Sequence, residues 1–174
     1  MSASRRLATA VGGALVAGAL AFTGSASAVT WSVSMSGAKQ TASGIPGDPN
    51  GTGSASITGY PSQNRLCATV SWSNIAQPVV AGHIHEGAAG QPENPAWTIN
   101  LFGPNINGTS NPVSACTTVT AQQINAMNKT PWLFNVVVHN QAYPAGAIRG
   151  QLGPGGLCQV LDVCVDPPPP PTGA

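Results

Sequence analysis

Charged side chains are scarce in this chain, because Asp, Glu, Lys and Arg make up only 6% of its 174 residues. An ordinary globular domain has about a quarter. Two of the six basic residues, Arg5 and Arg6, belong to a leader described below, and without them four basic and five acidic residues leave a net charge of −1. Binding of nucleic acid needs a clustered basic face, so this composition excludes that class of partner.

Long hydrophobic runs are also few, and the one present lies near the N-terminus. Arg5 and Arg6 precede the run LATAVGGALVAGALAF, and an A-x-A pattern at Ala26 and Ala28 follows it. These features are typical of a secretory signal peptide, which we assign to residues 1–28 with cleavage near Ala28. No later run is long enough to form a transmembrane segment. We therefore expect a secreted, extracellular protein with no such segment in its mature chain.

The residues after the leader are enough for one domain with its own hydrophobic core. We place this domain at residues 29–165. The last nine residues, 166–174, read DPPPPPTGA. A proline run of this kind adopts polyproline II, so we expect a tail outside the fold that acts as a spacer.

Cysteine is limited to four residues, which in an exported protein indicates two disulfides. Three pairings are possible in principle. We favour Cys67 with Cys116, because each lies in a strand-like run, and Cys158 with Cys164 near the C-terminus. Zinc binding by four cysteines is disfavoured, since no C-x-x-C pair is present and the compartment is oxidising.

Alternation of apolar and polar residues dominates the rest of the chain and indicates half-buried strands. It is clear in VTWSVSMS (29–36), RLCATVSWS (65–73) and AWTINLF (96–102), whereas the apolar PWLFNVVVH (131–139) is typical of a central strand. Only TAQQINAMN (120–128) predicts a helix, with Thr120 as its N-cap and Ile124 and Met127 packed inward. Glycine- and proline-rich turns separate the strands. The pattern predicts an all-β fold, an antiparallel Greek-key β-sandwich of about seven or eight strands.

Several segments together resemble one family. They are GDPNGTGSASIT (47–58), LCATVSWSNI (66–75), AGHIHEGAAG (81–90), CTTV (116–119) and VVVHNQAYPAGAIRGQL (136–152). Their order and content are similar to the CHRD domain, which is named for its occurrence in chordin, an extracellular antagonist of growth factors. The resemblance implies an antiparallel β-sandwich that acts as an extracellular binding module for a ligand or protein not identified by the sequence.

Two of the three histidines in the chain, His83 and His85, are two residues apart and therefore share one face of a strand. Strict alternation would place Val79 and Ala81 on this face, and Val80 and Ile84 on the other. His139, near the end of a different strand, could supply a third imidazole. Three neutral imidazoles suit copper or zinc better than calcium or magnesium, so we predict a metal site at His83, His85 and His139.

A second, shorter resemblance concerns the same strand. The segment GHIHEG is similar to the His-x-His strand of Cu/Zn superoxide dismutases, in which both histidines bind copper on a Greek-key β-sandwich. This chain has only three histidines, so a complete two-metal site is excluded. Three hypotheses remain for the function. The chain is a copper- or zinc-binding module, or it is a copper-only redox enzyme related to superoxide dismutase. In the third hypothesis it is a metal-free protein-binding domain whose histidines only make hydrogen bonds across the sheet.

Two charged residues adjoin these motifs. Glu86 could accept a hydrogen bond from a histidine N–H, or simply face solvent. Arg149 could draw an anion toward a metal, or its guanidinium could bind backbone carbonyls inside the sandwich. Glu86 and Glu93 give weak support for glycoside hydrolysis, and no serine has a recognisable base, so we assign no catalytic residue.

Overall fold

The computed structural model describes residues 27–103 and 111–153, and its eight strands form one antiparallel sheet. The strand order is β5-β4-β7-β8-β1-β2-β3-β6. The strands are β1 (Val29–Ser36), β2 (Thr52–Tyr60), β3 (Arg65–Ser73), β4 (Val79–Glu86), β5 (Asn94–Phe102), β6 (Val113–Thr118), β7 (Phe134–Asn140) and β8 (Ile148–Gln151). The predicted all-β, antiparallel fold class is confirmed.

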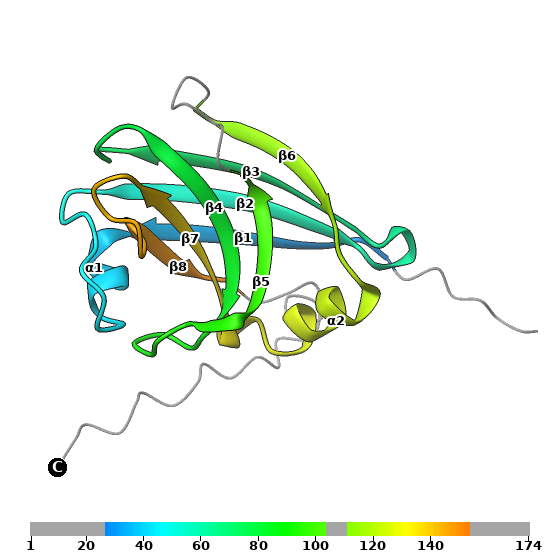
Figure 1. Cartoon of the computed structure of the whole chain (residues 1–174). Helices are drawn as coiled ribbons and strands as arrows, with labels where there is room; N and C mark the ends of the chain where they lie inside the picture. Colours follow the sequence, from blue (N-terminus) through cyan, green and yellow to red (C-terminus); the bar gives the residue numbers. More distant parts are fainter. Residues whose placement is uncertain (1–26, 104–110, 154–174) are drawn as a thin grey trace, which may run out of the picture.

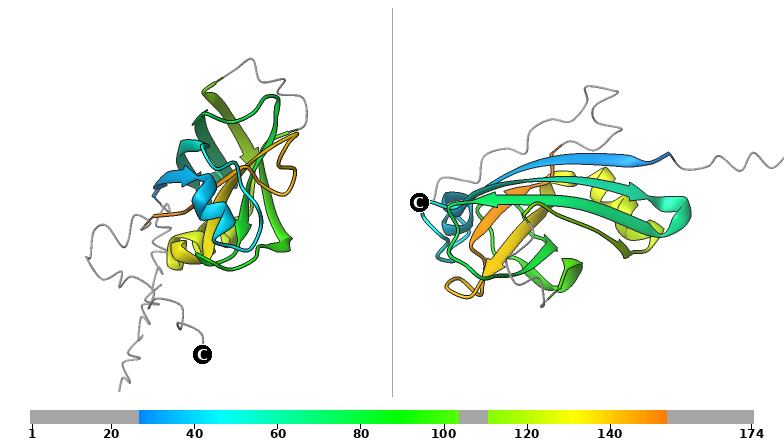
Figure 2. Two further views of the ribbon diagram at one scale, coloured as in Figure 1. Left: turned by 90° about the vertical axis from the view of Figure 1, so that its left-hand side faces the viewer. Right: turned by 90° about the horizontal axis from the view of Figure 1, so that it is seen from above.

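The sheet folds back on itself into two facing layers. Figures 1 and 2 show β1, β2, β3 and β6 in one layer, crossed by β4, β5, β7 and β8 in the other. A single residue pair, Ser36 with Arg149, joins the two layers between β1 and β8. Non-consecutive strands lie side by side where β3 pairs with β6 and β4 with β7, as Greek-key connections require.

Strand alternation fills the space between the layers. In β1, Trp31 and Val33 are buried while the serines and threonine between the apolar positions are exposed, and β3 repeats this pattern. All seven residues of β7 are buried, so both of its faces are covered. The core covers one face, and on the other Asn135 Nδ2 donates to the carbonyl oxygen of Gly87 in the turn after β4. Apolar residues that alternation places inward therefore make the core, as predicted.

Helices are few among the described residues. The helix α2 (Ala121–Lys129) begins at the predicted N-cap, Thr120, whose side chain accepts a hydrogen bond from the backbone N–H of Gln123. Ile124 and Met127 point inward and are fully buried. The other elements are α1 (Gly37–Thr41) and two short 3-10 turns, η1 (Pro61–Gln63) and η2 (Pro131–Leu133). No helix in the described ranges is long and apolar enough to span a membrane.

The disulfide between Cys67 and Cys116 is confirmed, and it joins directly opposed residues of β3 and β6. The predicted partner pair, Cys158 and Cys164, lies outside the described residues, as do most of the predicted leader and the proline-rich tail.

Candidate metal centre

The three histidines lie on the outer face of the β4–β7 layer. His83 pairs across the sheet with Val137, and His139 pairs with Ala81. Residues paired in this way share a face, so all three imidazoles project to one side. The alternate residues Ile84 and Val136 project to the other side, into the core.

Strict alternation fails at the start of β4, and the prediction for Val79 and Val80 was wrong. Val79 is fully buried in the core with Ile84, whereas Val80 is half-buried. The pairing of β4 with β7 shifts register between Val79 and Ala81. Such a bulge adds one residue to a strand and reverses the face on which the preceding residues lie.

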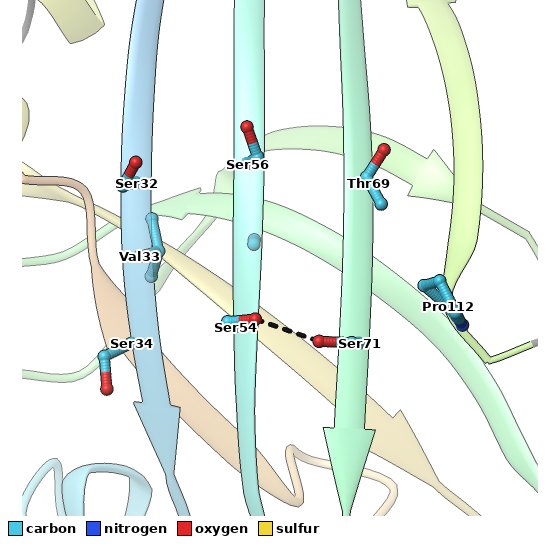
Figure 3. A pocket seen from close by; sticks show the side chains of 9 residues that line it. Ser32, Val33, Ser34, Ser54, Ser56, Thr69, Ser71 and Pro112 are labelled. Atoms are coloured by element: carbon cyan, nitrogen blue, oxygen red, sulfur yellow. Dashed lines mark hydrogen bonds between the residues drawn. The ribbon is translucent and has the colours of Figure 1, made fainter.

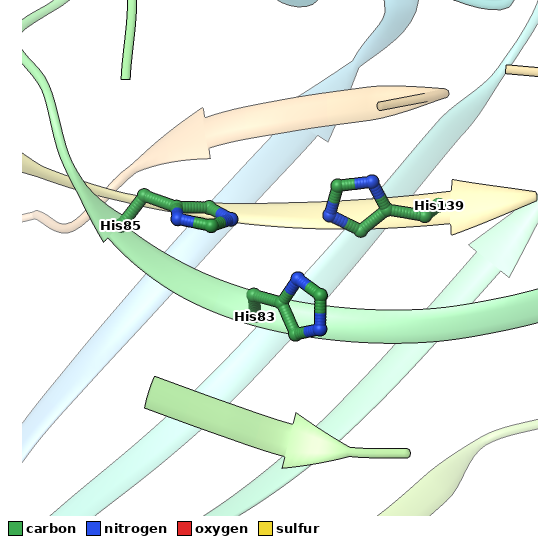
Figure 4. Close-up of side chains that lie close together, drawn as sticks. All are labelled: His83, His85 and His139. Atoms are coloured by element: carbon green, nitrogen blue, oxygen red, sulfur yellow. The ribbon is translucent and has the colours of Figure 1, made fainter. Parts of the chain in front are cut away.

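The structure brings His83, His85 and His139 together. Each offers one ring nitrogen, and these atoms all lie within 4.8 Å of one another. The ring centroids are separated by 4.7 Å for His83 and His139, 5.4 Å for His83 and His85, and 6.1 Å for His85 and His139. Figure 4 shows the rings of His85 and His139 pointing toward each other along the sheet, with His83 beside the gap. The three side chains could therefore hold one ion.

Hydrogen bonds determine which nitrogen of two rings carries the proton. His139 Nδ1 lies 3.0 Å from the carbonyl oxygen of Pro144, which can only accept, so Nδ1 donates. His85 Nδ1 lies 3.2 Å from Thr98 Oγ1. Because the Thr98 hydroxyl donates to the carbonyl oxygen of Pro95, it accepts from His85. In both rings the proton is on Nδ1, which leaves a lone pair on Nε2.

These two Nε2 atoms are buried and have no hydrogen-bond partner within residues 27–103 and 111–153. A buried acceptor without a partner costs roughly 1–3 kcal/mol. A bound cation would remove this cost. The sequence did not predict that Thr98 and Pro144 would contact these histidines, because no local motif identifies their oxygens as acceptors.

Burial also keeps the imidazoles neutral. The pKa of His85 is lowered to about 4, mainly by desolvation and further by the charges of His83 and His139. The pKa of His139 is lowered to about 4 by desolvation and then by His83. Desolvation lowers the pKa of His83 as well. Neutral imidazole is the form that binds metals.

Of the two carboxylates considered from the sequence, Glu93 is the one that faces the histidines. Its Oε2 lies 3.8 Å from His85 Nε2. Glu86 instead accepts a hydrogen bond of 2.8 Å from Asn94 Nδ2. Glu93 lies in the turn between β4 and β5, so only the folding of that turn over the outer face brings it to the site.

Arg149 holds the same turn in place from β8. Its Nη2 donates to the carbonyl oxygens of Gly87 and Ala88 at 3.0 and 2.9 Å. Its Nη1 donates to the carbonyl oxygen of Gln91 at 2.9 Å and lies 3.5 Å from Glu93 Oε1. Of the two roles considered from the sequence, these contacts favour the binding of backbone carbonyls.

A separate hollow lies on the outer face of the other layer. It is shallow, about 570 Å³ in volume, and Figure 3 shows serine and threonine side chains along it. Ser54 and Ser71 make a hydroxyl–hydroxyl hydrogen bond of 2.9 Å across it. Its lining residues include no histidine, cysteine or carboxylate, so this hollow offers neither a metal ligand nor an acid–base group.

The family model of the CHRD domain matches residues 21–152 of the chain. The chain belongs to the CHRD domain family. The match includes every residue of the site described above, and it extends further toward the N-terminus than the motifs that first indicated the family. Neither a curated protein nor a solved structure matched the chain. The likeness to superoxide dismutase therefore rests on the GHIHEG segment alone.

Proposed function

We propose that this CHRD domain binds one transition-metal ion, copper or zinc, through His83, His85 and His139. The observation that carries the proposal is that the buried Nε2 atoms of His85 and His139 have no hydrogen-bond partner in the described part of the chain. Hydrogen bonding of each Nδ1–H fixes the ring orientation, a common arrangement at metal-binding histidines. Imidazole ligands favour zinc and copper over magnesium and calcium.

The Cys67–Cys116 disulfide agrees with the oxidising environment expected for an extracellular module. In this proposal the domain is a secreted binding module, and the ion is held by its three histidines. Thr98 and the Pro144 carbonyl orient two of these ligands.

Metal titration tests the proposal directly. Untagged, metal-free protein is titrated with Zn²⁺ and with Cu²⁺ in a calorimeter, and bound metal is counted by elemental analysis. We expect one equivalent of at least one ion, and loss of that binding in His139→Ala. Thr69→Ala, on the opposite layer, is the matched control and keeps wild-type binding. A wild-type protein that takes up neither ion contradicts the proposal.

A copper-only redox enzyme is the alternative, and one observation favours it. Three protein ligands leave a further coordination position on copper, and His83 is only half-buried, so a small oxidant could approach from its side. Copper-loaded wild-type protein should then dismutate superoxide, and His139→Ala should be inactive yet folded. Activity that survives in His139→Ala would refute the assignment.

A metal-free protein-binding role makes a different prediction. Binding of an extracellular partner would persist when all three histidines are replaced by alanine. Loss of partner binding in that variant, with the fold intact by circular dichroism, would connect recognition to the metal centre.

A further inference from the structure

A buried positive charge lies beside the proposed metal centre. The side chain of Arg149 is 1% exposed, and the Glu93 carboxylate that lies 3.5 Å from its Nη1 also lies 3.8 Å from His85 Nε2. A cation bound at His85 would therefore experience repulsion from this guanidinium, and burial increases such repulsion because solvent screens it less. The site needs a compensating negative charge close by.

Glu93 occupies the position from which it could compensate this charge. Its Oε1 lies 3.5 Å from Arg149 Nη1, and its Oε2 lies 3.8 Å from His85 Nε2. The side chain is only 11% exposed. The carboxylate and the lone pair on His85 Nε2 are both electron-rich, so they repel each other unless a cation lies near them. A metal ion on His85 would be attracted by both groups.

We infer that Glu93 makes the centre selective for a divalent ion over monovalent copper, by offsetting the charge of Arg149 and attracting the ion bound at His85. This inference rests on the proposed function, because it requires an ion at the three histidines. Glu93 does not belong to the group whose ligand atoms all lie within 4.8 Å of one another. Its role is therefore electrostatic, without a bond to the metal.

The selectivity follows from Coulomb's law. The interaction of a carboxylate with an ion scales with the charge of that ion, so loss of the carboxylate weakens binding of Zn²⁺ about twice as much, in free energy, as binding of Cu⁺. Changes to residues that support metal ligands typically cost about 10- to 100-fold in affinity. We expect a loss in this range for Zn²⁺ and roughly its square root, about 3- to 10-fold, for Cu⁺.

The test compares Glu93→Gln with the wild-type protein. Glutamine keeps the size of the side chain and removes its charge. Affinities for Zn²⁺ and for Cu⁺ are measured by competition with chromophoric chelators of known affinity. Glu86→Gln is the matched control, because it removes an equal charge from the end of β4, where Glu86 accepts a hydrogen bond from Asn94. We expect Glu86→Gln to change either affinity by less than about 3-fold, a smaller effect than that of a metal-supporting group.

Three results would overturn the inference. The first is a Glu93→Gln protein with wild-type affinity for Zn²⁺. The second is an equal loss for Zn²⁺ and Cu⁺, which would indicate a purely structural role. The third concerns the electron paramagnetic resonance spectra of the Cu²⁺-loaded wild-type and Glu93→Gln proteins. A difference between them that indicates a changed oxygen or nitrogen ligand would make Glu93 a direct ligand. Glu93→Asp keeps the charge and should retain the preference for Zn²⁺ over Cu⁺, even if the turn is less stable.

The same measurements separate this inference from the proposed function. If wild-type protein binds no ion, the proposed function fails. If wild-type protein binds an ion, His139→Ala does not, and Glu93→Gln behaves like Glu86→Gln, only the role of Glu93 fails.

Discussion

His83 and His139 lie on adjacent strands, β4 and β7, with ring centroids 4.7 Å apart. The two residues are far apart in the sequence, and the Greek-key crossing between the layers makes their strands neighbours. The candidate metal centre therefore depends on the topology of the whole domain, and several measurements can examine the groups that support it.

The first prediction concerns Thr98. Thr98→Val has nearly the same shape but removes the oxygen that accepts the hydrogen bond from His85 Nδ1. The ring of His85 then loses the contact that keeps its proton on Nδ1, and we expect metal affinity to fall about 10-fold. Thr69→Val is the control, since Thr69 lies on the other layer and bonds Ser114. Equal affinities for the two variants in the calorimeter would show that Thr98 does not support the site.

The second prediction concerns the stability of the metal-free protein at acidic pH. Burial lowers the pKa of His85 and of His139 to about 4, whereas both titrate near 6.5 in an unfolded chain. Between these values the unfolded state binds more protons, so the free energy of unfolding rises with pH. We expect a loss on the order of 2 kcal/mol per histidine as the pH falls from about 6.5 to about 4.

Urea unfolding at several pH values measures this loss. The titratable or charged groups that face these histidines are His83, Glu93 and Arg149. Burial raises the pKa of Glu93, so its contribution to the pH dependence has the opposite sign. Comparison with His85→Gln/His139→Gln isolates the two histidines, because that variant keeps the other three groups. A double variant with the same pH dependence as wild type would contradict the prediction.

The third prediction concerns the disulfide between β3 and β6. Cys67 and Cys116 are 49 positions apart in the sequence, and a cross-link that closes a loop of this length contributes roughly 4 kcal/mol by restricting the unfolded chain. We expect Cys67→Ser/Cys116→Ser to lower the free energy of unfolding by about this amount in urea. Metal affinity should stay unchanged, since this pair and the histidines lie in different layers.

The fourth prediction concerns the two remaining cysteines. Non-reducing peptide mapping of the mature protein should recover Cys158 and Cys164 in one disulfide-linked fragment, as expected for an exported chain. Free thiols at these positions, or a link from either one to Cys67, would show that the predicted pairing is wrong.

The fifth prediction concerns the leader. The protein recovered from the medium of an expressing host should begin at Val29, as determined by N-terminal sequencing or intact mass. Substitution of Ala28 by a bulky residue such as Trp should impair processing, because the cleavage site requires small side chains. Efficient processing in Ala28→Trp, or an uncleaved N-terminus in the exported wild type, would contradict the assignment.

Much of the fold could be predicted because its signals are local. Alternation in 29–36 and 65–73 correctly placed Trp31 and Leu66 in the core. Thr120, as the predicted N-cap, marked the start of α2. Val79 was misplaced because a bulge changes the alternation without a signal in the sequence. A bulge depends on how one strand pairs with its neighbour.

The groups that support the histidines could not be foreseen in the same way. Glu93 lies in the turn between β4 and β5, which contains glycine and proline, and the sequence does not indicate which way its side chain points. Arg149 decides where this turn lies by binding its carbonyl oxygens from another strand. Contacts of this kind form only after distant segments have packed.

The sequence by itself determined the strand content, the family and the common face of His83 and His85. Each of these follows from residue types and from spacings of a few residues, together with the motifs of the family. Only the tertiary structure decided that His139 joins the pair and that Glu93 rather than Glu86 approaches it. It also decided that two buried Nε2 atoms lack hydrogen-bond partners among the residues that the structure describes. These features depend on which strands become neighbours and on how a turn folds over them, and both are set by the packing of the whole sheet.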